Sequence, residues 1–251
     1  MYIIVMDEIQ NLELCITAAK KAGEFLYKNK NQLNKTHSAI GRDIKLLADT
    51  KSENLIIEFL QNNSNYPILG EEAGKSDELG EIYWVVDPLD GTANFARNIP
   101  ICCVSIALVH NHNPVLGAIY DFNNSDIYYG SVNKGAYLNK NKINVSKIAD
   151  QSQATLITGL PVNTDYSSDS MLTLINDFKN WKKIRMLGSA AMAAAYVASG
   201  KVDTYKESGT NLWDVAAGVA IVRAAGGAAI ISNMQEDFSL DIHMSNSILK
   251  A

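Results

Sequence analysis

The sequence predicts a layered fold of the α/β or α+β class, and three observations carry this prediction. Segments with helical spacing of apolar residues mix with short β-branched runs along the chain, and they alternate after residue 150. Of the 251 residues, 47% are hydrophobic and 20% are charged, which is ordinary for a globular protein with a sizeable core. The sequence shows no internal repeat, linker or low-complexity segment. Mixed elements of this kind pack as layers, in one large domain or two small ones.

The first helix is expected over residues 6–29, because apolar residues recur there near helical spacing: Ile9, Leu12, Ala19, Ala22, Phe25 and Leu26. Residues 30–42 are polar, so we expect a loop that could lie over a site as a lid. A second helix should follow. Thr50 and Glu53 have the spacing of a capping box, and Asp49 lies just before it. The helix dipole favours a carboxylate at that position, which is the structural alternative to any catalytic role of Asp49.

Acidic residues then follow two strands. Tyr66–Leu69 is expected to be a strand that ends in Gly70, Glu71 and Glu72. Ile82–Val86 is expected to be a buried strand that ends at Asp87, since Pro88 cannot donate to a sheet ladder. If the two strands are neighbours, their carboxylates share one sheet edge, where ligand sites gather. Taken alone, the two glutamates are typical of a solvated loop.

The middle of the chain is rich in expected strands, namely 104–109, 115–120 and 127–129. Turn-like residues separate them at 111–114, 121–125 and 133–135. We interpret His110 and His112 as surface residues, because no pattern of metal-ligating residues accompanies them.

After residue 150 the expected strands are 154–158, 183–186, 202–205, 228–231 and 247–249, and the expected helices are 171–178, 190–198 and 213–225. Gly188, Ser189 and Ala190 open the second of these helices. Gly226 and Gly227 end the third, as a C-cap signal does.

The net charge of −5 argues against a general basic surface for nucleic acid. An anionic substrate would therefore need local positive charge, which a metal ion can supply. The three cysteines form neither a disulfide framework nor a zinc pattern, so we expect buried thiols in a reducing cytoplasm. The Ala-rich stretches 189–198 and 215–229 are broken well before about 20 apolar residues, and no membrane span is expected.

The most informative stretch is Asp87-Pro88-Leu89-Asp90-Gly91-Thr92. Two carboxylates so close together repel each other unless a cation lies between them, and Mg²⁺ takes oxygen ligands while keeping positions open for water and phosphate. Gly91 lets the backbone approach a ligand, and Thr92 offers a hydroxyl. Free N–H groups at the start of a helix or turn could bind phosphate. The structural alternative is a turn with an Asp cap.

Other chemistries lack their motifs in this sequence. It has no Walker A sequence, no G-x-G-x-x-G and no G-x-S-x-G. Neither Cys102 nor Cys103 is followed six residues later by Arg, and the spacing D-x-x-D differs from the D-x-D of aspartyl-phosphate enzymes. Metal-assisted hydrolysis is the chemistry that these absences leave open. Six acidic residues are candidates for its site: Asp49, Glu71, Asp87, Asp90, Glu207 and Asp214.

The stretch WVVDPLDGTANF at 84–95, the sequence GEE at 70–72 and LWDVAAG at 212–218 together resemble the inositol monophosphatase family. The resemblance extends in order over nearly the whole chain. It implies an α+β fold, a layered αβαβα sandwich of the inositol monophosphatase and fructose-1,6-bisphosphatase type. It also implies a single catalytic domain over 1–251, with an N-terminal α+β part about 1–150 and a C-terminal α/β part about 151–251. Family members usually pair as homodimers and are commonly sensitive to lithium.

The resemblance also implies roles. Glu71, Asp87 and the backbone carbonyl of Leu89 would hold one Mg²⁺, and Asp87, Asp90 and Asp214 would hold a second. Asp49 would contact metal through water, either at one of these two ions or at a third. Thr92 and Glu71 would orient and activate the attacking water. The substrate would meet Asp90, Gly91 and Thr92 with its phosphate, and Gly188, Ser189, Ala190 and Glu207 with its alcohol portion.

The implied activity is Mg²⁺-dependent hydrolysis of a small phosphorylated alcohol such as myo-inositol monophosphate. Fructose 1,6-bisphosphate, histidinol phosphate and 3′-phosphoadenosine 5′-phosphate are the alternative substrates, and a regulatory scaffold that keeps the fold is the alternative of another class. The sequence departs from the family at Ala93, at Lys45-Leu46, at Asn211 and near Pro161-Val162. Lys45 could form a salt bridge with Asp43 or reach the metal and phosphate region. Several departures fall in the leaving-group region, so the identity of the alcohol is open.

Overall fold

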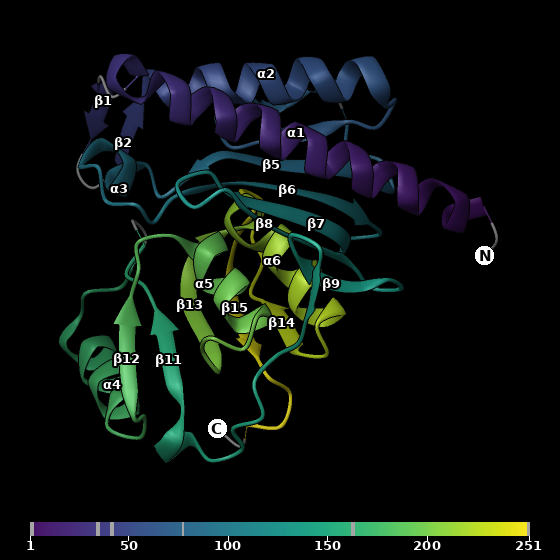
Figure 1. Ribbon diagram of the computed structural model, residues 1–251. Coiled ribbons are helices and arrows are strands. Elements are labelled where there is room, and N and C mark those ends of the chain that lie inside the picture. Colours follow the sequence, from purple (N-terminus) through teal and green to yellow (C-terminus); the bar gives the residue numbers. More distant parts are fainter. Residues whose placement is uncertain (1–2, 34–35, 41–42, 77, 162–163, 250–251) are drawn as a thin grey trace.

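The computed structural model describes residues 3–33, 36–40, 43–76, 78–161 and 164–249, with side chains from residue 8 onward and none described for 36–40 and 43–45. Figure 1 shows five layers: α1 and α2, a large sheet, α5 and α6, a second sheet, and α4. The chain is therefore a layered αβαβα sandwich of α+β class, as the family resemblance implied.

The outer layer contains α1 (Ile3–Leu33), α2 (Leu47–Asn63) and a hairpin of β1 (Thr36–Ile40) and β2 (Asp43–Leu46). The loop expected over 30–42 is therefore wrong. The helix continues to Leu33, and the polar residues beyond it form an antiparallel ribbon whose backbone groups pair with each other.

The start of α2 also differs from the expected capping box. The helix begins at Leu47, and Asp49 in its first turn accepts the backbone N–H of Leu46 at 2.5 Å. The carboxylate of Glu53 turns away from the helix and accepts the backbone N–H of Glu72 at 3.0 Å. Asp49 thus caps α2, and Glu53 is released to hold a distant turn.

The large sheet has eight strands in the order β10-β9-β8-β7-β6-β5-β3-β4. Neighbouring strands are antiparallel except β3 and β5, which are parallel. The strands are β3 (Ile68–Gly70), β4 (Gly74–Lys75), β5 (Ile82–Asp90), β6 (Cys103–His110), β7 (Asn113–Asp121), β8 (Asp126–Ser131), β9 (Gly135–Leu138) and β10 (Asn141–Ile143). The strands β4, β9 and β10 were not expected from the sequence.

Strand β5 does not end at Asp87. It continues to Asp90, and its register with β6 shifts between the pairs Asp87–Ser105 and Asp90–Cys103. Pro88 lies inside this irregularity, where the missing N–H costs no ladder hydrogen bond. The bulge carries both aspartates to the same end of the strand, and a short helix, α3 (Thr92–Ala96), follows Gly91.

The second sheet has the order β12-β11-β13-β15-β14. Its strands are β11 (Thr155–Thr158), β12 (Lys183–Met186), β13 (Thr204–Asn211), β14 (Ala228–Ser232) and β15 (Ser239–Ser245), and the helices of this half are η1 (Gln151–Gln153), α4 (Ser168–Phe178), α5 (Ala190–Ala198) and α6 (Leu212–Ala224). Strand β13 is longer than expected and contains Glu207. The strand expected at 247–249 is wrong, because the C-terminal strand that pairs with β13 and β14 is β15.

Two large apolar clusters hold the first four layers together. One lies between α1, α2 and the large sheet and includes Leu26, Ile56 and Trp84. The other joins the large sheet to α5, α6 and the second sheet, and it includes Ala194 and Val215. A smaller cluster, which includes Leu156 and Trp181, packs against Phe178 of α4. The three cysteines are buried free thiols, as expected. Within the described residues, no helix combines the length and apolarity that a membrane crossing requires.

Candidate metal and phosphate site

Five predicted carboxylates gather where β3, β5, α2 and α6 meet. Strands β3 and β5 are parallel neighbours with Gly70 opposite Val86, so Glu71 leaves β3 beside Asp87. The backbone N–H of Glu71 donates to the carbonyl of Val86 at 3.2 Å. Asp49 arrives from the first turn of α2 and Asp214 from the first turn of α6. The prediction that neighbouring strands deliver carboxylates to one edge is confirmed.

These carboxylates repel one another in a buried environment. Burial raises the pKa of Glu71 well above its usual value, and the negative charges of Asp214 and Asp49 raise it further. Burial likewise raises the pKa of Asp87, with added repulsion from Glu71, Asp90 and Asp214. The pKa of Asp49 rises to about 6, mainly through burial, and that of Asp214 to about 6 through burial and the charge of Asp90. A cation among these groups would relieve the repulsion.

The donor chemistry fits a hard divalent cation. The predicted ligands are carboxylate oxygens and the carbonyl of Leu89, which is the oxygen-only set that Mg²⁺ prefers. Among the described residues, no three His, Cys, Asp or Glu side chains lie close enough together to hold one metal ion as they stand. The carboxylates would have to move closer to bind an ion, and which residues hold it stays a prediction.

Thr92 links two of the predicted groups. Its Oγ1 lies 2.9 Å from Oδ1 of Asp49 and 2.9 Å from the carbonyl oxygen of Leu89. Both neighbours accept hydrogen bonds, so the hydroxyl proton is directed toward one of them. Before Thr92, Gly91 has φ +87°, and a Cβ there would lie 2.8 Å from the carbonyl oxygen of Ile101. Only glycine suits this turn.

Asp90 is tied to the start of α5. Its carboxylate accepts the hydroxyl of Ser189 and the backbone N–H groups of Ala190 at 3.2 Å and Ala191 at 2.9 Å. Ser189 in turn caps α5 by accepting the N–H of Met192 at 3.3 Å. Two motifs about a hundred residues apart thus form one hydrogen-bonded unit.

A cavity of about 220 Å³ adjoins this unit. The predicted residues among those that line it are Asp90, Gly188, Ser189, Ala190, Glu207 and Asp214. Glu71, Asp87, Thr92 and Asp49 are not among its lining residues. The pKa of Glu207 rises to about 8 through burial and the charge of Asp214, and Oε2 of Glu207 accepts the hydroxyl of Tyr205 at 3.1 Å.

Several residues of the site escaped sequence reasoning. The hydroxyl of Thr210 donates to Asp214 at 2.9 Å, and that of Ser52 donates to the carbonyl of Pro88 at 2.9 Å. The amide of Asn94 donates to the carbonyls of Ile101 and Leu187, each at 2.8 Å. Asn94 lies inside the motif at 84–95, although the sequence does not indicate this bridging role, and no motif marks Ser52 or Thr210. Two of the predicted departures from the family cannot be placed in the site. Val162 lies outside the described residues, and so does the side chain of Lys45.

Comparison with known proteins gives a family. The model of the inositol monophosphatase family matches residues 7–249. A protein named Nus factor SuhB from Xylella fastidiosa is 37% identical over 220 residues, which cover 86% of this chain and 80% of that protein. An inositol-1-monophosphatase from Synechocystis is 34% identical over 227 residues, which cover 86% of this chain and 77% of that protein.

Solved structures agree with this assignment. The structure of inositol monophosphatase from Anabaena (Nostoc) superposes with a TM-score of 0.83 at 30% identity, covering 96% of this chain and 92% of that one. The extragenic suppressor protein suhB from Bartonella henselae superposes with a TM-score of 0.85 at 29% identity, covering 96% of this chain and 94% of that one.

Proposed function

The chain belongs to the inositol monophosphatase family of phosphoric monoester hydrolases, and we propose that it hydrolyses a small phosphorylated alcohol in a Mg²⁺-dependent reaction. The observation that carries the proposal is the meeting of five carboxylates where β3 and β5 end beside α2 and α6; Asp49, Asp87 and Asp90 are buried, and Glu71 and Asp214 are partly buried. A phosphate ester carries about two negative charges near neutral pH, and these carboxylates alone would repel it.

Glu71, Asp87, Asp90, Asp214 and the carbonyl of Leu89 would hold two Mg²⁺ ions, with Asp49 contacting them or a third ion through water. Bound Mg²⁺ would supply the positive charge that attracts the phosphate and stabilises the oxygen leaving with the alcohol. The raised pKa values of Glu71 and Asp87 support this assignment, because these groups hold their ionised form poorly without a cation.

Thr92 and Glu71 would handle the attacking water. Because Asp49 and Leu89 direct the proton of the Thr92 hydroxyl, its oxygen lone pair can accept a hydrogen bond from the water. Glu71 would accept the proton that the water loses as its oxygen bonds to phosphorus. The bond from phosphorus to the alcohol oxygen would break in the same displacement, and the departing oxygen would take up a proton from solvent water to give the alcohol. No covalent enzyme intermediate is needed.

The remaining predicted residues would position the substrate. Backbone N–H groups near Gly91 and Thr92 would bind phosphate oxygens. Ser189, Ala190 and Glu207 line the cavity beside Asp90 and would face the alcohol. The polar residues of this mixed lining could hydrogen-bond the hydroxyls of a small alcohol such as myo-inositol, and the departure at Asn211 argues for testing other alcohols.

The substitution Asp90→Asn tests this function. Asparagine has nearly the shape of aspartate and keeps one oxygen that can accept the hydrogen bonds of Ser189 and Ala191. It lacks the negative charge that we expect to bind Mg²⁺. Mg²⁺-dependent phosphate release should fall by more than a hundredfold, while circular dichroism and the melting temperature show that the variant is folded. Turnover that survives this change would refute the site assignment.

A regulatory role is the second candidate, and one observation favours it: several relatives bear the name Nus factor SuhB. On that alternative the chain would keep the fold and bind a macromolecular partner. The same variant separates the two, because a scaffold should keep partner binding after Asp90→Asn. A homodimer, a single catalytic domain over 1–251 and lithium sensitivity also stay proposals that rest on the family, and a cytoplasmic location stays a proposal that rests on the free cysteines.

A further inference from the structure

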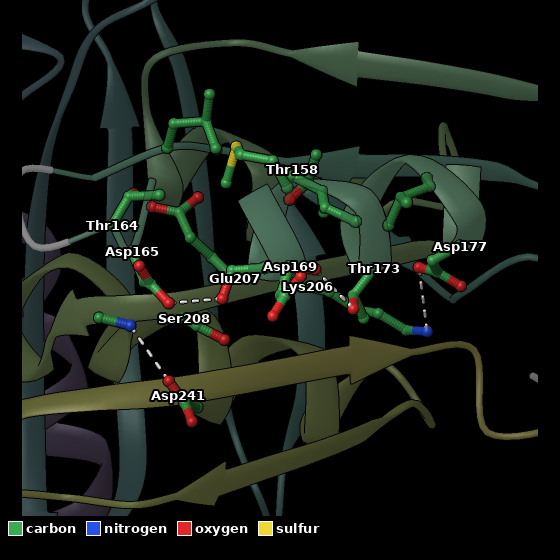
Figure 2. A pocket seen from close by; sticks show the side chains of 17 residues that line it. Thr158, Thr164, Asp165, Asp169, Thr173, Asp177, Lys206, Glu207, Ser208 and Asp241 are labelled. Atoms are coloured by element: carbon green, nitrogen blue, oxygen red, sulfur yellow. Dashed lines mark hydrogen bonds and ion pairs between the residues drawn. The ribbon is translucent and has the colours of Figure 1, made fainter. Parts of the chain in front are cut away.

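A second and larger cavity adjoins the candidate site. It has a volume of about 780 Å³ and lies among α4, β11 and β13 (Figure 2). Thr158, Gly159, Leu160 and Glu207 line both this cavity and the smaller one beside Asp90. We propose that this large cavity receives the distal part of the leaving alcohol, and that the preferred alcohol carries a cationic amine rather than a second phosphate. The inference rests on the proposed function.

Glu207 lies between the two cavities. Gly159 has no side chain, and a Cβ there would overlap Oε2 of Glu207. The carboxylate of Glu207 therefore lies against bare backbone, and its side chain lines both cavities. This shared lining puts the large cavity within reach of a substituent several bonds long on an alcohol held beside Asp90.

The ionisable lining of the large cavity is strongly acidic. It contains one basic residue and five acidic ones: Lys206, Asp165, Asp169, Asp177, Glu207 and Asp241. Figure 2 shows these labelled side chains around the same space. An acidic concave surface concentrates cations and repels anions.

Lys206 is already engaged. Its Nζ lies 3.9 Å from a carboxylate oxygen of Asp177 and 5.0 Å from the centre of the Trp181 ring. Asp177 and Trp181 hold the ammonium group of Lys206 beside α4. Among the described residues that line the cavity, no basic side chain is therefore left without a partner to bind an incoming phosphate.

The carboxylates differ in how they are used. Asp165 accepts the hydroxyls of Ser167 and Ser170, and Asp241 accepts the N–H of Gly209 at 3.1 Å. Asp169 is exposed in the first turn of α4, and within the described residues its only hydrogen bond with a side chain is through its backbone carbonyl, which accepts the hydroxyl of Thr173. Asp169 is thus the carboxylate best able to meet an ammonium group.

Apolar residues complete the cavity and suit the carbon chain between the two charged ends. Leu156, Leu160, Met171 and Leu174 line it together with the acidic residues. A carbon chain or ring that bears an amine matches both features. Of the alternative substrates, histidinol phosphate has this chemistry, whereas fructose 1,6-bisphosphate and 3′-phosphoadenosine 5′-phosphate bring a second phosphate into acidic surroundings.

Three matched esters test the inference: butyl phosphate, 4-aminobutyl phosphate and butane-1,4-diyl bisphosphate, each with Mg²⁺ and at low salt. We expect kcat/KM to be about fivefold higher for the amine than for butyl phosphate, which is the size of one partly exposed ion pair, and lowest for the bisphosphate. Histidinol phosphate, which also carries an amine, should likewise have a higher kcat/KM than butyl phosphate.

Asp169→Lys should bring the ratio of kcat/KM for the amine ester to that for the butyl ester down to about one. Glu58→Lys, an exposed change on α2 with the same change in net charge, should leave that ratio intact.

The outcomes separate the two proposals. Equal kcat/KM for the amine and butyl esters, a preference for the bisphosphate, or a ratio unchanged by Asp169→Lys would overturn the inference while the phosphatase function stands. A failure of the wild-type protein to release phosphate from any of the esters would overturn the proposed function and the inference with it.

Discussion

The carboxylate of Glu53 occupies the space where a side chain of Gly70 would begin, since a Cβ added to Gly70 would overlap Oε1 of Glu53. Glu53 is only 2% exposed, and the same Oε1 accepts the backbone N–H of Glu72. Glu53 on α2 thus holds the turn after β3 from which Glu71 enters the candidate site. Glu53 can make this contact only because residue 70 is a glycine and has no side chain.

Gly70→Ala should therefore disturb the site without touching a predicted ligand. The new Cβ forces Glu53 or the turn to move, and overpacking of this kind costs about 1–3 kcal/mol of unfolding free energy. We also expect weaker Mg²⁺ binding by the displaced Glu71. Chemical denaturation measures the first effect, and calorimetric Mg²⁺ titration measures the second.

Gly80→Ala is the matched control, because Gly80 is exposed and nothing lies within 4 Å of its added Cβ. In a Glu53→Ala background, Gly70→Ala should cost much less, since the two residues share one contact. Equal costs in both backgrounds would mean that Gly70 acts in some other way.

Ser189→Ala should weaken both α5 and the site. The change removes the helix cap to Met192, worth about 1 kcal/mol, and one of the donors that hold Asp90. We expect the free energy of unfolding to fall by about that amount and the Mg²⁺ concentration for half-maximal activity to rise severalfold.

Ser199→Ala controls for the loss of a hydroxyl on the same helix. Ser199 donates to the carbonyl of Ala195 at the other end of α5 and has no contact with Asp90. An equal rise in the Mg²⁺ requirement for both variants would show that the Asp90 contact is not what matters.

The pH dependence of stability should reveal the carboxylates. The folded pKa of Asp49 and of Asp214 is about 6, above the ordinary value of 3.8, and that of Glu207 is about 8, above 4.5. Without metal, the folded state keeps protons that the unfolded chain has lost, so these groups lower stability as pH rises from about 4 to about 8. Mg²⁺ would bind the ionised forms of Asp49 and Asp214, so the stability that it adds should grow as pH rises from about 4 to about 6. The pKa values of Glu71 and Asp87 are also raised, which extends this growth to higher pH.

The measurement is the melting temperature with Mg²⁺ minus that with EDTA, taken at matched ionic strength from pH 5 to 8. Exposed groups whose pKa is lowered, such as Asp165 and Asp237, act alike in both conditions and cancel in the difference. A difference that stays flat or shrinks as pH rises would contradict the assignment of a cation to this cluster.

Much of the fold followed from local patterns. The central strands of the large sheet are short, buried and bounded by turn residues, and α5 and α6 are framed by the glycine and serine signals that end and begin helices. The motifs also predicted that Glu71 and Asp87 would meet, because two consecutive strands each ended in acid. These features depend on residues close together in sequence.

The misses have two different causes. Residues Ser239–Ser245 alternate strictly between polar and apolar, which is a strand pattern that sequence reasoning overlooked, and β13 and β14 pair with this strand on either side. The other misses depend on partners far along the chain. Pro88 remained inside β5 because a bulge opposite β6 accommodates it. The cavity beneath α4 arises from the packing of α4 on β11 and β13, which no local pattern encodes.

The measurement that tests the central claim most directly is release of inorganic phosphate by the purified protein, with Mg²⁺, with EDTA and with added Li⁺. The substrates are inositol 1-phosphate, fructose 1,6-bisphosphate, histidinol phosphate and 3′-phosphoadenosine 5′-phosphate. We predict release that requires Mg²⁺, stops with EDTA, falls with Li⁺ and favours one ester well above the others. Absence of release from every ester, by a folded protein that binds Mg²⁺, would contradict the claim and favour the regulatory role.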